Sequence, residues 1–157
     1  MNHPGETIAI VDYLPEHAQA FKDLNVEWIT TYWELEAPDL KALDHPVENV
    51  IDVGGAILIA LHEQEAIGTV ALIPHDATTL ELAKMAVSPK VQGLGAGQKL
   101  GHAAIERAKA LGAARLYLET NTILKPAISL YQKLGFQEIK GVTSPYERCN
   151  FQMELFL

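Results

Sequence analysis

Cysteine is almost absent from this sequence of 157 residues, which holds only Cys149. A single cysteine forms neither an intrachain disulfide nor a thiolate metal cluster. The six histidines lack the paired helical spacing of a zinc site, so we expect no bound metal. No apolar run reaches the roughly 18–20 residues of a membrane span, and no basic stretch followed by an apolar run opens the chain. We therefore expect a cytoplasmic protein that does not bind membranes.

Basic residues are also scarce. Lysine and arginine number 12 against 20 aspartates and glutamates, which gives a net charge of −8. Such a surface repels a phosphate backbone, so nucleic acid is not expected as a partner. It attracts a cationic ligand such as a free amine instead. The charge is spread unevenly, because the segment 84–109 is basic whereas most carboxylates precede it.

The sequence does contain enough apolar residues, 48% of the chain, for a single domain over residues 1–157. The apolar period switches between strand and helix spacing, which predicts a mixed α/β fold. We expect strands over 7–11, 56–61, 67–73, 80–87, 115–118, 136–139 and 150–157. We expect helices over 15–32, 39–43, 100–111 and 126–134, the first with an apolar stripe of Ala18, Phe21, Leu24, Trp28 and Tyr32.

The fourth predicted strand changes phase along its length. Leu80 and Leu82 share one phase of the alternation, whereas Met85 and Val87 share the other. A bulge near residues 83–84 explains the change, because one extra residue resets the phase, and bulges are common beside active sites. A strand buried on both faces, where strict alternation is not expected, also explains it and is the explanation that the residues alone favour.

Three glycines, Gly93, Gly95 and Gly97, lie between this strand and the next helix. Glycine lets the backbone approach a ligand, and the first amides of a helix have no partner within the helix. The helix dipole adds to these donors, so a phosphate or pyrophosphate is the favoured occupant. Alternatively, the glycines only permit close packing of the strand and the helix.

The spacing separates the known phosphate-binding loops. A nucleoside triphosphate loop requires Gly-Lys followed by Ser or Thr, whereas Lys99 follows Gln98 and precedes Leu100. A dinucleotide fingerprint requires glycine where Gln98 stands, although Glu119 lies where a ribose-binding acid would belong. A dinucleotide-binding oxidoreductase is therefore a weak alternative. The third pattern, Gln/Arg-x-x-Gly-x-Gly/Ala, fits residues 92–97.

Two further segments accompany this pattern: Ile67-Gly68-Thr69, and Leu130-Tyr131-Gln132-Lys133-Leu134-Gly135-Phe136. Together they resemble the GNAT superfamily of acetyl-CoA-dependent N-acetyltransferases over nearly the whole chain. The resemblance implies a mixed, mostly antiparallel sheet of six to seven strands with splayed fourth and fifth strands, flanked by about four helices. It implies transfer of an acetyl group from acetyl-CoA to a primary amine by direct attack in a ternary complex.

The resemblance also implies how acetyl-CoA binds. The main chain of Met85 and Val87 pairs with the pantetheine arm beyond a bulge, which makes the bulge the preferred explanation of the phase change. Leu124 stands where many family members place an asparagine, and we expect Asn121 to take over that cofactor contact. The loop amides hold the pyrophosphate, which assigns this role to Gln92, Gly93, Leu94, Gly95, Ala96, Gly97 and Gln98.

Catalytic roles follow from the same resemblance. Tyr131 matches the tyrosine that protonates the departing CoA thiolate, although its place on an apolar helical stripe alone indicates a core residue. Glu81 matches an acid that accepts the proton of the amine directly or through water, and Glu119 is the second candidate. Both acids can instead be solvated charges at strand ends. Trp33, Glu119 and Tyr146 are the expected acceptor-binding residues.

Another interpretation remains at this stage. A module that binds CoA without catalysis, as a sensor or subunit, has the same fold. The presence of Tyr131 and Glu81 favours the enzyme. The resemblance also implies a homodimer as one assembly, although no exposed apolar surface can be identified in the sequence to support it.

Overall fold

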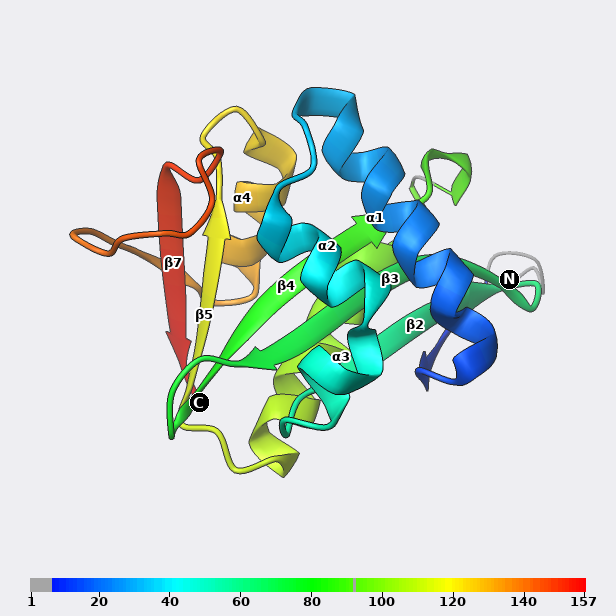
Figure 1. Cartoon of the computed structure of the whole chain (residues 1–157), viewed down its shortest axis with the longest axis horizontal. Helices are drawn as coiled ribbons and strands as arrows, with labels where there is room; N and C mark the ends of the chain where they lie inside the picture. The colour runs from blue at the N-terminus through cyan, green and yellow to red at the C-terminus, as the bar shows by residue number, and fades with distance from the viewer. Residues whose placement is uncertain (1–6, 92) are drawn as a thin grey trace.

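The structure, a computed structural model, describes residues 7–91 and 93–157. A seven-stranded sheet forms its centre, in the order β1-β2-β3-β4-β5-β7-β6 (Figure 1). Neighbouring strands are antiparallel except β4 and β5, which are parallel. The predicted mixed and mostly antiparallel sheet is therefore confirmed.

The predicted strands and helices are all present, with ends shifted by one to several residues. The strands are β1 (Ile8–Asp12), β2 (Ala56–His62), β3 (Glu65–Pro74), β4 (Thr79–Val87), β5 (Arg115–Thr120), β6 (Gln137–Ile139) and β7 (Phe151–Phe156). The main helices are α1 (Ala18–Tyr32), α2 (Ala37–Asp44), α3 (Ala96–Ala110) and α4 (Lys125–Lys133). A short π-helical turn, Val47–Ile51, follows α2 and was not predicted.

Helices cover both faces of the sheet, with α1 and α2 on the face nearer the viewer in Figure 1 and α3 on the other. The core on the α1 side includes Phe21, Leu43 and Ile59. The core on the α3 side includes Leu100 and Leu116. The strands between the two cores are apolar on both faces, which is why β2 is a continuous apolar run rather than an alternating one.

The apolar stripe predicted for α1 is partly wrong. The buried positions are Phe21, Asn25 and Ile29, so the face that meets the sheet is rotated from the predicted one. Tyr32 is 51% exposed. The side chain of Asn25 is buried because its amide donates hydrogen bonds to the Phe21 carbonyl and to the Thr69 hydroxyl. A buried polar residue in the stripe misleads a periodicity argument that counts only apolar side chains.

The bulge in β4 is confirmed by the pairing with β3. Thr69 pairs with Ala86, and Ala71 pairs with Ala83, so β4 has one more residue than β3 between these pairs. Lys84 takes up the extra length with a φ of 51°, a left-handed conformation that is uncommon for a side chain other than glycine. The phase change between residues 82 and 85 therefore marks a bulge.

Candidate functional site

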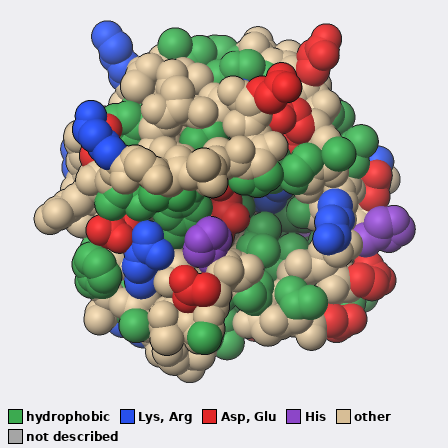
Figure 2. Space-filling view, turned by 60° about the vertical axis from the view of Figure 1, so that its left-hand side comes forward, with side chains coloured by type: hydrophobic (Ala, Val, Ile, Leu, Met, Phe, Trp, Pro, Cys, Tyr) green, Lys and Arg blue, Asp and Glu red, His purple; other side chains and the backbone are tan. Residues whose placement is uncertain are grey.

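A cleft opens where β4 and β5 separate. The last parallel pair is Glu81 with Tyr117, and beyond it the two strands diverge. The resulting cavity measures about 440 Å³ and is lined by α1, β4, the end of β5, the start of α4 and residues 146–149. Figure 2 shows this side of the molecule hollowed, with apolar side chains around the hollow.

The cleft brings together most of the side chains that the sequence singles out. Nine of them line it: Trp33, Glu81, Met85, Val87, Gly97, Glu119, Asn121, Tyr131 and Tyr146. The loop residues Gly93, Leu94, Gly95, Ala96 and Gln98 are not part of its lining, although they adjoin Gly97. Gln92, also predicted to bind the cofactor, lies outside the described residues.

The glycine loop has the geometry of an anion site. Gly93 and Gly95 have φ values of 87° and 77°, and a Cβ atom added at either would meet nothing within 4 Å. Gly95 precedes the first turn of α3 without a side-chain cap, so the first amides of that helix have no side-chain acceptor. These donors and the helix dipole fit a pyrophosphate. Gly97 differs, because a Cβ there would lie 3.4 Å from Leu130, so this glycine also serves the packing of α3 against α4.

The positive charge predicted for residues 84–109 is partly neutralised by ion pairs with carboxylates outside this segment. The ammonium group of Lys84 lies on the α2 side of the sheet, where it pairs with Asp39. Arg107 pairs with Asp12 on β1. Lys84 and Arg107 are therefore not free to bind a phosphate, and the donors that this segment offers to one are mainly the backbone amides of the loop.

Glu81 is placed to act as a base. Its side chain lines the cleft at the point where β4 and β5 part. Burial, reinforced by the negative charge of Glu119, raises the pKa of Glu81 to about 7, and the nearby Lys84 opposes this only in part. A carboxyl with a pKa near neutrality accepts a proton from a substrate far better than one with an ordinary pKa.

Tyr131 faces the cleft from α4. Its ring packs edge-on against Phe136, with 6.0 Å between the ring centroids. Its hydroxyl forms no hydrogen bond within the described residues, and burial raises its pKa to about 12. The phenol is therefore protonated at neutral pH and free to donate its proton to a group in the cleft.

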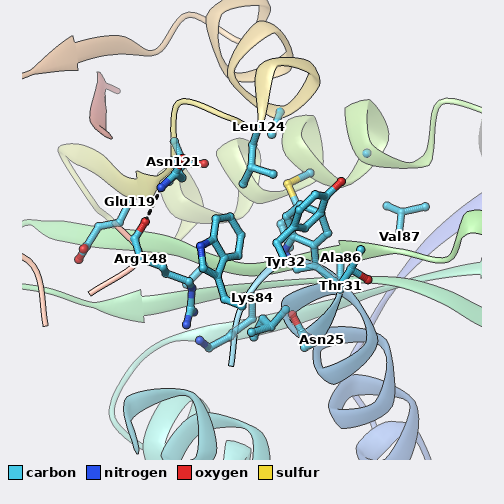
Figure 3. Close-up of a pocket in the computed structure, with 18 of the residues that line it drawn as sticks. Asn25, Thr31, Tyr32, Lys84, Ala86, Val87, Glu119, Asn121, Leu124 and Arg148 are labelled. Atoms are coloured by element: carbon cyan, nitrogen blue, oxygen red, sulfur yellow. Dashed lines mark hydrogen bonds between the residues drawn. The ribbon is translucent and has the colours of Figure 1, made fainter. Parts of the chain in front are cut away.

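Asn121 lines the cleft, but its amide is already used within the protein. Its nitrogen donates a hydrogen bond of 2.8 Å to the Arg148 carbonyl, and its oxygen accepts one of 3.0 Å from the Ile123 amide (Figure 3). The second N–H of the amide and one further lone pair of its oxygen are left for a ligand. Leu124, at the position where many members of the resembled family have asparagine, is buried in the lining.

Sequence reasoning missed an ion cluster at the end of the cleft that adjoins α2 and residues 146–148. We call this the acceptor end, because Tyr146, one of the expected acceptor-binding residues, lies there. The cluster is formed by Glu36, Asp39, Lys84 and Arg148. The guanidinium of Arg148 donates two hydrogen bonds to Asp39, of 2.7 and 2.8 Å, and one of 3.0 Å to Glu36. The Lys84 ammonium lies 2.5 Å from Asp39 and 3.1 Å from the Tyr146 hydroxyl. Burial opposes the charge on Asp39, but the hydrogen bonds from Arg148 and Lys84 outweigh it and lower its pKa to about 2.

An aromatic wall, also underestimated from the sequence, covers one side of the cleft. Trp28, Tyr32 and Trp33 at the end of α1 all line it. Neighbouring rings are 5.3 and 5.4 Å apart between centroids. Trp28 and Tyr32 were expected in the core because they recur at helical spacing, yet they form part of this wall. Their helical spacing predicts a shared face but does not say whether a sheet or a ligand covers it.

Within residues 7–91 and 93–157, no group of three or more histidine, cysteine, aspartate or glutamate side chains is arranged to hold a metal ion. In the same part of the chain, no helix has the length and apolar character needed to cross a bilayer.

Comparison with known proteins gives consistent matches. Residues 18–136 match the acetyltransferase (GNAT) family. The uncharacterized N-acetyltransferase YjgM of Escherichia coli is 38% identical over 89 residues, which cover 55% of this chain and about half, 53%, of that relative. The uncharacterized N-acetyltransferase YvbK of Bacillus subtilis is 33% identical over 124 residues, covering 77% of this chain and 79% of the relative.

Solved structures share the fold. A GNAT-family acetyltransferase from Staphylococcus aureus superposes with a TM-score of 0.85 at 23% identity, covering 94% of this chain and 98% of the other. The acetyltransferase yncA of Salmonella typhimurium, solved with its cofactor acetyl-CoA, superposes with a TM-score of 0.75 at 18% identity, covering 96% of this chain and 94% of the other.

Proposed function

Because this chain belongs to the GNAT family of acetyltransferases, we propose that it transfers the acetyl group of acetyl-CoA to a primary amine within a ternary complex. The observation that carries the proposal is the cleft between β4 and β5, with Glu81 and Tyr131 in one lining and the open glycine loop beside it. The acetyl-CoA in the yncA structure supports the choice of cofactor. We place the reaction in the cytoplasm.

The glycine loop and the main chain of β4 would hold acetyl-CoA, which supplies the reactive thioester. The β5-facing edge of β4 has no partner strand beyond Glu81, so its backbone groups can pair with an extended ligand there. The bulge at Lys84 interrupts the regular pairing of β4 beside the cleft, and we propose that a backbone amide of β4 there polarises the acetyl carbonyl.

Two side chains of the cleft move protons. Glu81 takes a proton from the amine, directly or through water, so that the nitrogen lone pair can attack the acetyl carbonyl carbon. The new C–N bond forms as the C–S bond breaks, and Tyr131 donates its proton to the leaving sulfur. The pKa values of about 7 and about 12 suit these two roles, because Glu81 ionises near neutrality and Tyr131 stays protonated.

The test is release of free CoA thiol from acetyl-CoA in the presence of a panel of primary amines, with product identified by a mass increase of one acetyl group. Amine-dependent thiol release supports the proposal. Acetyl-CoA binding without release for any amine would overturn it in favour of the non-catalytic module. NAD binding without CoA binding would restore the oxidoreductase.

A further inference from the structure

The acceptor end of the cleft contains two cations, and both form ion pairs with carboxylates of the protein. Arg148 uses two of its N–H groups on Asp39 and another on Glu36, and its guanidinium carbon lies 4.5 Å from the centre of the Tyr146 ring. The Lys84 side chain is only 5% exposed and binds Asp39 and the Tyr146 hydroxyl. The ends of the two basic side chains converge in Figure 3. Their two positive charges are balanced by two carboxylates, so among the described residues that line this end of the cleft no cation is left to receive a carboxylate of a ligand.

Other carboxylates of the cleft have no such partner. Glu81 and Glu119 both line it, and neither forms an ion pair with any residue in the described ranges. One oxygen of Glu119 is buried without a hydrogen-bond partner. Glu27 adds a third carboxylate from the exposed surface of α1. The unpaired charge around the cavity is therefore negative, which favours an ammonium group and opposes a second carboxylate.

The remaining surface of the cleft is mainly apolar. The aromatic wall of Trp28, Tyr32 and Trp33 lies along α1, and Leu124 and Tyr146 add apolar surface from other elements. An aromatic ring of a ligand gains contact area and stacking on such a wall. A flexible polyamine would place additional ammonium groups where the wall offers few acceptors.

We propose that the acceptor is a primary amine with an apolar, aromatic body and no carboxylate, the chemical class of the arylalkylamines. This inference rests on the proposed acetyl transfer. The ammonium of the acceptor lies between Glu81 and Glu119, and its body lies against the aromatic wall. The ammonium first loses one proton to Glu81. Its nitrogen then forms the new bond to the acetyl carbon as the thioester C–S bond breaks, and the sulfur leaves with the proton of Tyr131. The second proton lost from nitrogen, after the C–N bond has formed, restores the phenol of Tyr131.

Matched acceptor pairs test the inference with the purified full chain and acetyl-CoA. 2-Phenylethylamine and phenylalanine differ only in a carboxylate, as do tryptamine and tryptophan. We expect kcat/KM to be higher for the amine of each pair by at least about tenfold, because the carboxylate meets uncompensated negative charge. Phenylalaninamide separates charge from bulk: its neutral amide should recover most of the activity that phenylalanine loses. Putrescine and spermidine should be poorer acceptors than 2-phenylethylamine.

The outcomes separate the two proposals. Equal or better use of phenylalanine, or a preference for putrescine or spermidine, would overturn the inference while acetyl transfer stands. No thiol release with these amines, while another primary amine of the panel supports release, would also overturn the inference alone. Acetyl-CoA binding measured by calorimetry without release for any amine would overturn acetyl transfer itself and this inference with it.

A charge variant tests the position of the ammonium. Glu119→Gln should raise KM for 2-phenylethylamine about tenfold and leave KM for acetyl-CoA unchanged. Glu65→Gln, at the exposed start of β3, is the matched control and should change neither. An unchanged amine KM in the Glu119 variant would exclude the proposed ammonium position.

Discussion

The hydroxyl of Thr69 on β3 donates a hydrogen bond of 2.8 Å to the backbone carbonyl of Lys84, the residue at which β4 bulges. The same hydroxyl accepts a bond of 3.0 Å from the buried amide of Asn25 on α1. A left-handed lysine persists only where its surroundings fix it. Thr69 therefore links α1 to the bulge on which the cleft depends.

Thr69→Val should disturb this link with little change in volume. The Asn25 amide and the Lys84 carbonyl each lose a partner, which should cost about 1–3 kcal/mol of unfolding free energy. KM for acetyl-CoA should rise as well, because the bulge positions the β4 main chain. Denaturant unfolding and steady-state kinetics measure the two effects. Thr30→Val removes an exposed hydroxyl bonded only within α1 and is the control. If the Thr69 variant has the same unfolding free energy and the same KM for acetyl-CoA as the Thr30 variant, the bulge needs no support from Thr69.

Glu81→Gln should remove the acidic limb of the pH profile. The pKa of Glu81 is raised to about 7, so kcat/KM for the unprotonated amine should rise with pH through this region in the unaltered protein. Glutamine cannot titrate, so kcat/KM of the variant should be lower by roughly 10²- to 10⁴-fold and should not change with pH near 7. Profiles from pH 5.5 to 9 measure this. An acidic limb that survives in the variant would assign the titration to another group.

Glu119→Gln should shift the acidic limb rather than abolish it. The negative charge of Glu119 favours the protonated form of Glu81 and raises its pKa. Without that charge the pKa of Glu81 falls, so the limb should move to lower pH. The same pH profiles report the shift, and Glu65→Gln should leave the limb in place. A limb that stays in place or moves to higher pH in the Glu119 variant would contradict the electrostatic coupling.

Tyr131→Phe should lower kcat without weakening cofactor binding. The ring keeps its contact with Phe136, and only the proton donor is lost. A decrease of roughly 10²- to 10⁴-fold in kcat is expected for loss of a general acid, with KM for acetyl-CoA within about twofold of the original. Tyr13→Phe is the control, because the Tyr13 ring packs against Phe21 near the N-terminal end of α1 and does not line the cleft. If Tyr131→Phe turns over at the original rate, the proton comes from elsewhere.

Asp39→Asn should be strongly destabilising. It leaves Lys84 and Arg148 buried without their shared carboxylate, and breaking a buried ion cluster in this way costs about 3–5 kcal/mol. Asp44→Asn, on the same helix, breaks an exposed pair with Lys22 and should cost about 1 kcal/mol or less. The melting temperatures of the two variants, measured by thermal unfolding, compare their stabilities. Equal melting temperatures for the two variants would contradict the argument.

The pH dependence of this cluster has a defined sign. Folding lowers the pKa of Asp39 from 3.8 to about 2, so its stabilising contribution is present above pH 4 and is lost as the pH falls toward 2. The difference in stability between the unaltered protein and Asp39→Asn should therefore narrow over this range. A difference that stays constant down to pH 2 would show that ionisation of Asp39 is not its source.

The order of elements could be predicted because proline and glycine mark their ends and the apolar period identifies their type. Pro126 lies in the first turn of α4, and Gly112 and Gly135 follow the ends of α3 and α4 with positive φ. The bulge was visible as a phase change. The alternative of a strand buried on both faces was also consistent with the pattern until the pairing of β3 with β4 decided it.

The ion cluster could not be predicted from the sequence. Asp39 and Arg148 are separated by 109 residues, and Asp39 and Lys84 by 45. An isolated aspartate in a short helix has no local pattern that distinguishes it from a solvated charge. Only the packing of α2 and of residues 146–148 over the bulge shows that these charges neutralise one another. The cations of the cleft are consequently bound to the protein itself, which changes the class of acceptor that the site favours.

The bonds from Arg148 to α2 also determine when the site is completed during synthesis. Residues 36–39 and 84 leave the ribosome well before Arg148, so Asp39 and Lys84 can pair first. The segment that closes the acceptor end arrives only after β5 and α4 have been made, together with β7, which inserts between β5 and β6. A nascent chain can therefore assemble its glycine loop and β4 bulge while the acceptor end is still open. The end of the cleft beside α2 is therefore the last part of the site that the growing polypeptide completes.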